Sequence, residues 1–181
     1  MKDTASRFGP ISQGLHWLTV ALFAAQFSIA FYADGLPRGL EKLEWYGRHK
    51  SIGVTVLALV LLRLIWRRMN EKPTLPASMP RWEQILAHGT QHMLYLIMVA
   101  MPISGLVMSW SANYPVSVYG WFTLPNMVAP DEALKEAMVV VHEVIAWMII
   151  VLLSLHVAGA LRHHFMLKDD VLRRMLPWGK D

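Results

Sequence analysis

The chain contains no cysteine among its 181 residues. This absence excludes disulfides, thiolate-bound iron–sulfur clusters and the covalent CxxCH attachment of c-type haem. Charge is also scarce, because only 17% of the residues are Asp, Glu, Lys or Arg. Histidine and the few carboxylates remain as metal ligands, and histidine occurs eight times.

Hydrophobic residues make up 55% of the chain, and they concentrate in long stretches. A membrane-spanning helix needs about 20 mostly apolar residues. The sequence predicts an all-α integral membrane protein with helices at about 15–33, 50–68, 83–110 and 137–165. These helices form one four-transmembrane-helix bundle, so residues 1–181 are expected to be a single multi-pass membrane domain. Residues 111–131 form the longest connection, and their aromatic side chains either cover a site or form only an interfacial belt.

The basic residues are distributed unequally between the two sides of the predicted bundle. Twelve of the 17 lie in the N-terminal lead, the middle loop and the C-terminal tail: Lys2, Arg7, Arg63, Arg67, Arg68, Lys72, Arg81, Arg162, Lys168, Arg173, Arg174 and Lys180. Basic loops stay in the cytoplasm. We therefore expect both termini to be cytoplasmic. The excess of basic over acidic residues is then expected to reflect membrane orientation rather than nucleic-acid binding.

His142 and His156 lie within the last apolar stretch, fourteen residues apart. In an α-helix this separation corresponds to about 21 Å of rise and a rotation about 40° short of whole turns. The two imidazoles therefore share one face at two depths. Ionisable side chains at membrane depth are costly and usually mark a functional site.

Topology assigns a partner to each of these histidines. His16 begins the first helix on the cytoplasmic side, and His49 begins the second on the outer side, so depth pairs His16 with His156 and His49 with His142. Two imidazoles on facing helices of a bundle can hold a non-covalent b-type haem between apolar walls. The sequence predicts two such haems.

The remaining histidines leave several alternatives open. His88 and His92 lie four residues apart, so they could bind the inner haem, its propionates or water. Without the glutamate of HExxH they give little support to a zinc hydrolase. His163 and His164 either snorkel at the cytoplasmic interface or, in the case of His163, approach a propionate or a quinone head group.

Several motifs resemble those of the bacterial cytochrome b561 family over nearly the whole chain. They are His16-Trp17, Gly47 to Lys50, Ala87-His88 with His92 and Leu94-Tyr95, Pro102 to Gly105, His142-Glu143, His156, Ala160 to Phe165, Lys168-Asp169 and Leu172 to Pro177. The resemblance implies two b haems in a bacterial inner membrane. Its iron ligands carry over onto His16, His49, His142 and His156, the same four residues that topology selects.

The resemblance extends to stand-alone members of the family with superoxide:ubiquinone oxidoreductase activity. It implies that superoxide gives electrons to the outer haem and that they pass through the inner haem to ubiquinone. Arg48 and Lys50 flank His49, and they either draw the anion toward the outer haem or are only solvated helix-end charges. The neighbourhood of Ser12, His16, Arg162 and His163 is the expected quinone site.

A second interpretation is that a partner subunit, not this chain, carries out the catalytic reaction. Cytochrome b subunits of nickel–iron hydrogenases and formate dehydrogenases share the broad pattern of four ligands. On this reading the chain is an electron-transfer membrane anchor with a redox partner subunit. Short tails and loops offer little docking surface, which favours the stand-alone oxidoreductase.

Overall fold

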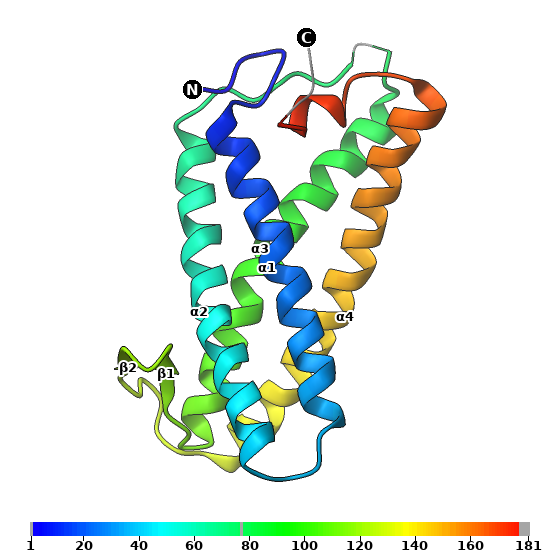
Figure 1. Ribbon diagram of the computed structural model, residues 1–181. Helices are drawn as coiled ribbons and strands as arrows, with labels where there is room; N and C mark the ends of the chain where they lie inside the picture. The colour runs from blue at the N-terminus through cyan, green and yellow to red at the C-terminus, as the bar shows by residue number, and fades with distance from the viewer. Residues whose placement is uncertain (1, 77, 178–181) are drawn as a thin grey trace.

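Long helices build almost all of the protein, as a computed structural model shows (Figure 1). The structure describes residues 2–76 and 78–177, so the predicted cytoplasmic Lys180 lies outside the described residues. The helices are α1 (Pro10–Gly35), α2 (Leu40–Arg68), α3 (Arg81–Ser111) and α4 (Glu132–Arg162). Each is long and apolar enough to cross a membrane. The prediction of an all-α bundle with four transmembrane helices is confirmed.

α1, α2 and α4 each begin earlier than expected, and α4 ends in an unexpected turn. α2 begins at Leu40 rather than near residue 50, because the helix continues through the charged turns that precede its apolar part. Charged side chains do not stop a helix where they can reach the interface. α4 is followed directly by a π-helical turn, His163–Leu167. This turn ends at Lys168, whose backbone is left-handed with a φ of 55°. Such π turns often occur at functional sites.

The packing leaves one side of the bundle loosely joined. Close backbone contacts join α1 to α2, α2 to α3 and α3 to α4, whereas α1 and α4 approach each other far less in the described part of the chain. Val56 and Val60 of α2 pack against Met98 of α3 in the main cluster of buried side chains. By contrast, Ile149 is the one fully buried side chain described on α4. Many large apolar side chains are exposed on all four helices, as expected where lipid is the solvent.

A short β-hairpin packs beside α2 at the end of the bundle opposite the termini (Figure 1). Strands β1 (Val116–Val118) and β2 (Phe122–Leu124) pair antiparallel. Positive φ angles at Tyr119 (51°) and Gly120 (75°) form the tight turn that favours hairpins. The aromatic connection predicted from sequence is therefore partly a folded hairpin. We call this end the hairpin end.

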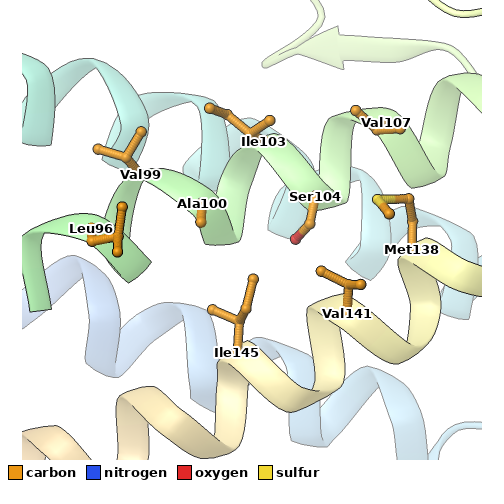
Figure 2. Close-up of a pocket in the computed structure, with 9 residues that line it drawn as sticks. All are labelled: Leu96, Val99, Ala100, Ile103, Ser104, Val107, Met138, Val141 and Ile145. Carbon is orange, nitrogen blue, oxygen red and sulfur yellow. The ribbon is translucent and has the colours of Figure 1, made fainter. Parts of the chain in front are cut away.

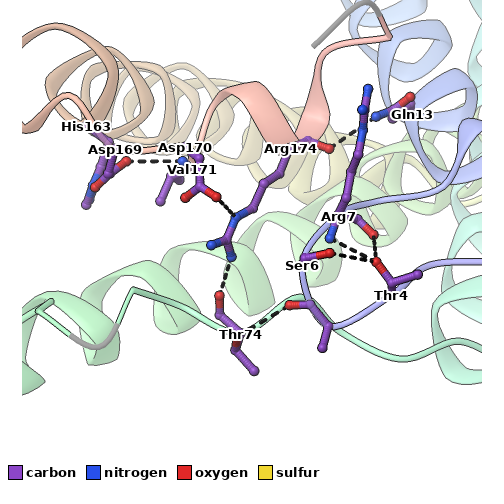
Figure 3. A network of polar contacts seen from close by, with 11 residues as sticks. Thr4, Ser6, Arg7, Gln13, Thr74, His163, Asp169, Asp170, Val171 and Arg174 are labelled. Atoms are coloured by element: carbon purple, nitrogen blue, oxygen red, sulfur yellow. Dashed lines mark hydrogen bonds and ion pairs between the residues drawn. The ribbon is translucent and has the colours of Figure 1, made fainter. Parts of the chain in front are cut away.

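Both termini lie at the other end of the bundle, which we call the terminal end (Figure 1). The C-terminal tail crosses over the start of α1, where Gln13 Nε2 donates to the carbonyl oxygens of Arg174 and Leu176. Arg174 also donates to Asp170 and to the carbonyl oxygen of Thr74 (Figure 3). The tail thereby links α1 to the connection between α2 and α3.

Candidate functional site

The rings of His16 and His156 face each other near the terminal end. His16 lies on α1 and His156 lies on α4. These two helices make few close backbone contacts with each other. Their ring centroids are 6.3 Å apart. The structure thus brings together the pair that depth selected from the sequence.

The rings of His49 and His142 form a second pair near the hairpin end. Their centroids are 6.4 Å apart, almost the same separation as in the first pair. His49 Nδ1 is buried and has no hydrogen-bond partner among the described residues. A buried ring nitrogen without a partner is costly, so this side chain needs a ligand or another bound group.

Both separations fit a metal held between two imidazoles. Metal–nitrogen bonds of about 2 Å on opposite sides of one ion place the two ring centroids about 6 Å apart. Among the described residues, no three His, Cys, Asp or Glu side chains gather to hold a bare metal ion. A pair alone suits a metal whose remaining ligands come from a macrocycle, as in haem.

Ser104 of α3 fixes the orientation of the His142 ring. Its Oγ lies 2.9 Å from His142 Nδ1 and donates to the carbonyl oxygen of Met101 at 2.7 Å. Because the hydroxyl hydrogen goes to Met101, Oγ accepts the hydrogen of Nδ1. This arrangement leaves the lone pair of His142 on Nε2, where a metal ligand needs it.

Gly105 allows this close approach of α3 and α4. A Cβ at Gly105 would lie 3.2 Å from His142 Cε1, too close for an undisturbed ring. Next to it, an apolar groove of about 410 Å³ separates the two helices. Figure 2 shows Ser104 pointing from α3 into this groove, opposite Val141 and Ile145 of α4.

The environment of His16 differs from that of His142. Arg63 of α2 places Nη2 2.7 Å from His16 Nδ1. A guanidinium only donates hydrogen bonds, so Nδ1 accepts. Arg63 also lies over the Tyr95 ring, 5.3 Å from its centroid, and no carboxylate among the described residues pairs with it. This cation is therefore available to an anionic group beside His16.

Arg48 and Lys50 lie on either side of His49 on α2, but they face different surroundings. The guanidinium of Arg48 stacks on Trp45, 4.3 Å from the ring centroid, and the side chain is exposed. Lys50 is half-buried, with Nζ 5.4 Å from the Tyr114 ring. The hairpin docks nearby, because Ser51 Oγ lies 3.0 Å from both the Ser117 oxygen and the Tyr119 nitrogen.

The other sequence-selected residues are spread over the terminal end. His88 and His92 are exposed on α3. Ser12 donates to Asp3 Oδ2 at 2.7 Å and accepts from Trp66 Nε1 at 3.0 Å, so its hydroxyl already has partners. The structure gives no direct contact between Ser12 and the pair Arg162 and His163 in the described residues.

His163 is buried, so the expectation that it snorkels at the interface is wrong. Its Nδ1 lies 2.5 Å from Asp169 Oδ2, and its Nε2 lies 3.2 Å from Glu83 Oε1. Arg162 pairs with the same Glu83 oxygen. Glu83 lies in the first turn of α3, which packs along α4, so the end of α4 meets it, and the turn after α4 brings Asp169 back to His163. Glu83 was not singled out from the sequence, and Asp169 stands out there only as part of a family-like motif.

Comparisons with known proteins agree with this architecture. The family described as prokaryotic cytochrome b561 matches residues 7–178. The chain belongs to this family. Cytochrome b561 homolog 2 of Escherichia coli (strain K12) is 34% identical, covering 96% of this chain and 93% of its own length. The probable superoxide oxidase CybB of Yersinia pestis is 28% identical, covering 94% of this chain and 96% of its own length.

Membership of the cytochrome b561 family gives the chain a coarse function. The protein is a bacterial membrane cytochrome that binds haem b and transfers electrons. The two histidine pairs fit this cofactor by separation, by the unpartnered His49 nitrogen and by the Ser104 contact. In the sequence, Ser104 and Gly105 stand out only as part of a family-like motif, and no pattern indicates that they contact His142.

Proposed function

We propose that this cytochrome b561 is a di-haem oxidoreductase of the bacterial inner membrane that oxidises periplasmic superoxide and reduces ubiquinone. Two superoxide anions become two dioxygen molecules, and one quinone takes up the two electrons with two protons to become quinol. The observation that carries the proposal is the pair of histidine couples at opposite ends of one bundle, with nearly equal separations. Positive charge at the terminal end supports cytoplasmic termini.

Each haem would be held by one histidine from the N-terminal half of the chain and one from α4. We assign His49 and His142 to the periplasmic haem and His16 and His156 to the cytoplasmic one. When bound, the haems supply one-electron redox chemistry that no protein side chain here provides. Ser104 holds the His142 ring with Nε2 free, and Arg63 offers positive charge to the propionates of the inner haem.

The hairpin end suits the approach of a small anion. Arg48 is exposed next to His49, and the Lys50 ammonium lies over the Tyr114 ring. Positive charge near a site raises the rate at which anions reach it. We therefore assign Arg48 and Lys50 to superoxide capture, and the hairpin to shielding the His49 side of the site.

The terminal end suits the quinone reaction, which consumes protons. His163 is held between Glu83 and Asp169, and Arg162 pairs with Glu83 beside it. These groups can hold and exchange protons close to the membrane surface. We place the quinone head group near Arg162 and His163, with His88, His92 and Ser12 as further polar groups at this end.

Haem analysis of the detergent-purified chain tests the cofactor assignment. Pyridine haemochrome should give two b haems per chain. His142→Ala should remove chiefly one spectral component and His156→Ala chiefly the other. One haem per chain, or no change in either variant, would overturn the assignment.

Superoxide and quinone assays then separate the enzyme from a membrane anchor. Superoxide should reduce the isolated chain faster than it reduces free haem, and ubiquinone should reoxidise the chain without any partner. A chain that holds two haems but responds to superoxide no faster than free haem would instead be an anchor for a redox partner subunit.

A further inference from the structure

A basic cavity lies at the terminal end, on the side where α2 and α3 meet. It has a volume of about 390 Å³. Its polar lining consists of Arg67, Arg68, Asn70, Lys72, His92 and Tyr95. Three of these side chains are cations and none is acidic, so the cavity carries concentrated positive charge.

The cations of this cavity are not neutralised by the protein. Arg67 stacks over the Tyr95 ring, 5.2 Å from its centroid, and Nη2 lies 3.4 Å from Gln91 Oε1. No ion pair to Arg67, Arg68 or Lys72 occurs among the described residues. Positive charges held together without a carboxylate favour an anionic ligand, and phosphate is the anion for which arginine is best suited.

Asn70 adds a requirement that phosphate alone does not meet. Its Nδ2 donates to the Trp66 carbonyl oxygen at 2.8 Å. Its Oδ1 is buried and has no hydrogen-bond partner in the part of the chain that the structure describes. An oxygen that only accepts needs a donor, so the ligand should carry a hydroxyl group as well as a phosphate.

The surface beside the cavity, toward the middle of the membrane, is apolar. Leu61 of α2 is 44% exposed. It lies one turn before Leu64, which lines the cavity. A ligand with a charged head and apolar chains would match both regions. Basic pockets between helices at the membrane surface commonly bind such lipids.

We propose that this cavity binds the headgroup of an anionic glycerophospholipid such as phosphatidylglycerol. Arg67, Arg68 and Lys72 contact the phosphate, and Asn70 Oδ1 accepts from a headgroup hydroxyl. The acyl chains lie along the exposed face of α2 at Leu61. The site is distinct from the His16 pair, because Arg63 and not Arg67 contacts His16.

Lipid titration of the detergent-purified, haem-loaded chain tests the proposal by native mass spectrometry. Phosphatidylglycerol should bind at lower concentration than phosphatidylcholine, which has no net charge. Arg68→Gln with Lys72→Gln should weaken phosphatidylglycerol binding by about tenfold or more, because each cation contributes to the attraction. Lys168→Gln with Arg173→Gln removes two exposed cations from the same end and should change the affinity much less.

Two further arms identify the ligand chemistry. Asn70→Ala should weaken binding of phosphatidylglycerol but not of phosphatidic acid, which lacks the headgroup hydroxyl. Inorganic phosphate at millimolar concentration should fail to displace the lipid, and complete displacement would mean that the site takes free phosphate. Equal affinity for the charged and uncharged lipids would overturn the proposal. Haem loss in the Arg68 and Lys72 variant would assign these cations to the cofactor and overturn it as well.

Discussion

Arg63 places a guanidinium nitrogen 2.7 Å from Nδ1 of His16, and no carboxylate in the described part of the chain pairs with this guanidinium. Because the guanidinium cannot accept a hydrogen, it holds His16 in the form whose Nε2 carries the hydrogen. Iron ligation through Nε2 requires that hydrogen on Nδ1, so Arg63 must then turn to another acceptor. The propionates of the proposed inner haem have the matching charge.

A cation next to the inner haem stabilises the reduced form, which carries one positive charge less. Arg63→Leu should therefore lower the reduction potential of the inner haem by tens of millivolts and leave the outer haem unchanged. Redox titration of the absorption spectrum measures both potentials. Arg67→Leu is the matched control, because Arg67 stacks on the same Tyr95 ring without contacting His16. Equal shifts in the two variants would contradict a specific role for Arg63.

Ser104→Ala should weaken haem binding at the outer site. The substitution removes the acceptor for His142 Nδ1, and loss of such a partner typically costs about 10- to 100-fold in metal affinity. Titration of the haem-free chain with haem, followed by the ligand-sensitive absorption bands, gives the affinity. Ser111→Ala is the control, because Ser111 Oγ makes the same kind of bond to a carbonyl three residues earlier. An equally large effect at Ser111 would point to a general change in α3.

Gly105→Ala should displace the His142 ring. The new Cβ would lie 3.2 Å from Cε1, so either the ring or α3 must shift by a few tenths of an ångström. We expect partial loss of the outer haem with the inner haem retained, measured as haem per chain and by the low-temperature spectrum. Gly89→Ala places the same methyl group on α3 in open space and should leave both haems in place. Full haem content in both variants would show that the helices absorb the contact.

Arg48→Glu with Lys50→Glu should slow reduction by superoxide while reoxidation by quinone stays the same. Electrostatic steering acts on the approaching anion and weakens with salt, because exposed charges are screened over about 8 Å at physiological ionic strength. Stopped-flow spectroscopy at several salt concentrations measures the rate. Arg38→Glu with Lys135→Glu reverses the same amount of charge elsewhere at the hairpin end. If this control slows the reaction equally, only the total charge matters and the two residues beside His49 have no special role.

Glu83→Gln should destabilise the terminal end. Glu83 contacts both Arg162 and His163, so the neutral amide leaves two donors poorly satisfied. The expected loss is about 1–3 kcal/mol of unfolding free energy, seen as a lower temperature of haem release. Glu71→Gln, at an exposed position, should have little effect. An unchanged transition in Glu83→Gln would mean that the contacts at the end of α4 contribute little to stability.

The bundle and the histidine pairing could be predicted from the sequence for physical reasons. A membrane imposes a length and an apolar composition on each span, so the four stretches were visible without any tertiary information. Helical periodicity placed His142 and His156 on one face, and the alternating direction of the spans gave His49 and His16 their depths. The structure brings the rings of each pair together, while their role as iron ligands stays a prediction.

Side-chain contacts between neighbouring helices could not be predicted from the sequence. Nothing in the sequence around Ser104 or Arg63 indicates which residue of another helix each one meets, because that depends on helix rotation and crossing. The hairpin was missed because its strands have only three residues each and depend on docking to Ser51. The burial of His163 depends on its contacts with Glu83 of α3 and with Asp169, which follows the π-helical turn, and the sequence pattern of α4 shows neither contact.

The weak packing between α1 and α4 has a consequence for how the protein is made. The closest packing joins α1 to α2 and α3 to α4 as two helical hairpins, and each proposed cofactor site takes one histidine from each hairpin. Insertion alone therefore completes neither site. Because α2 already packs against α3, haem capture would be the event that joins α1 to α4, so the supply of haem, rather than the rate of synthesis, would set how much mature protein accumulates.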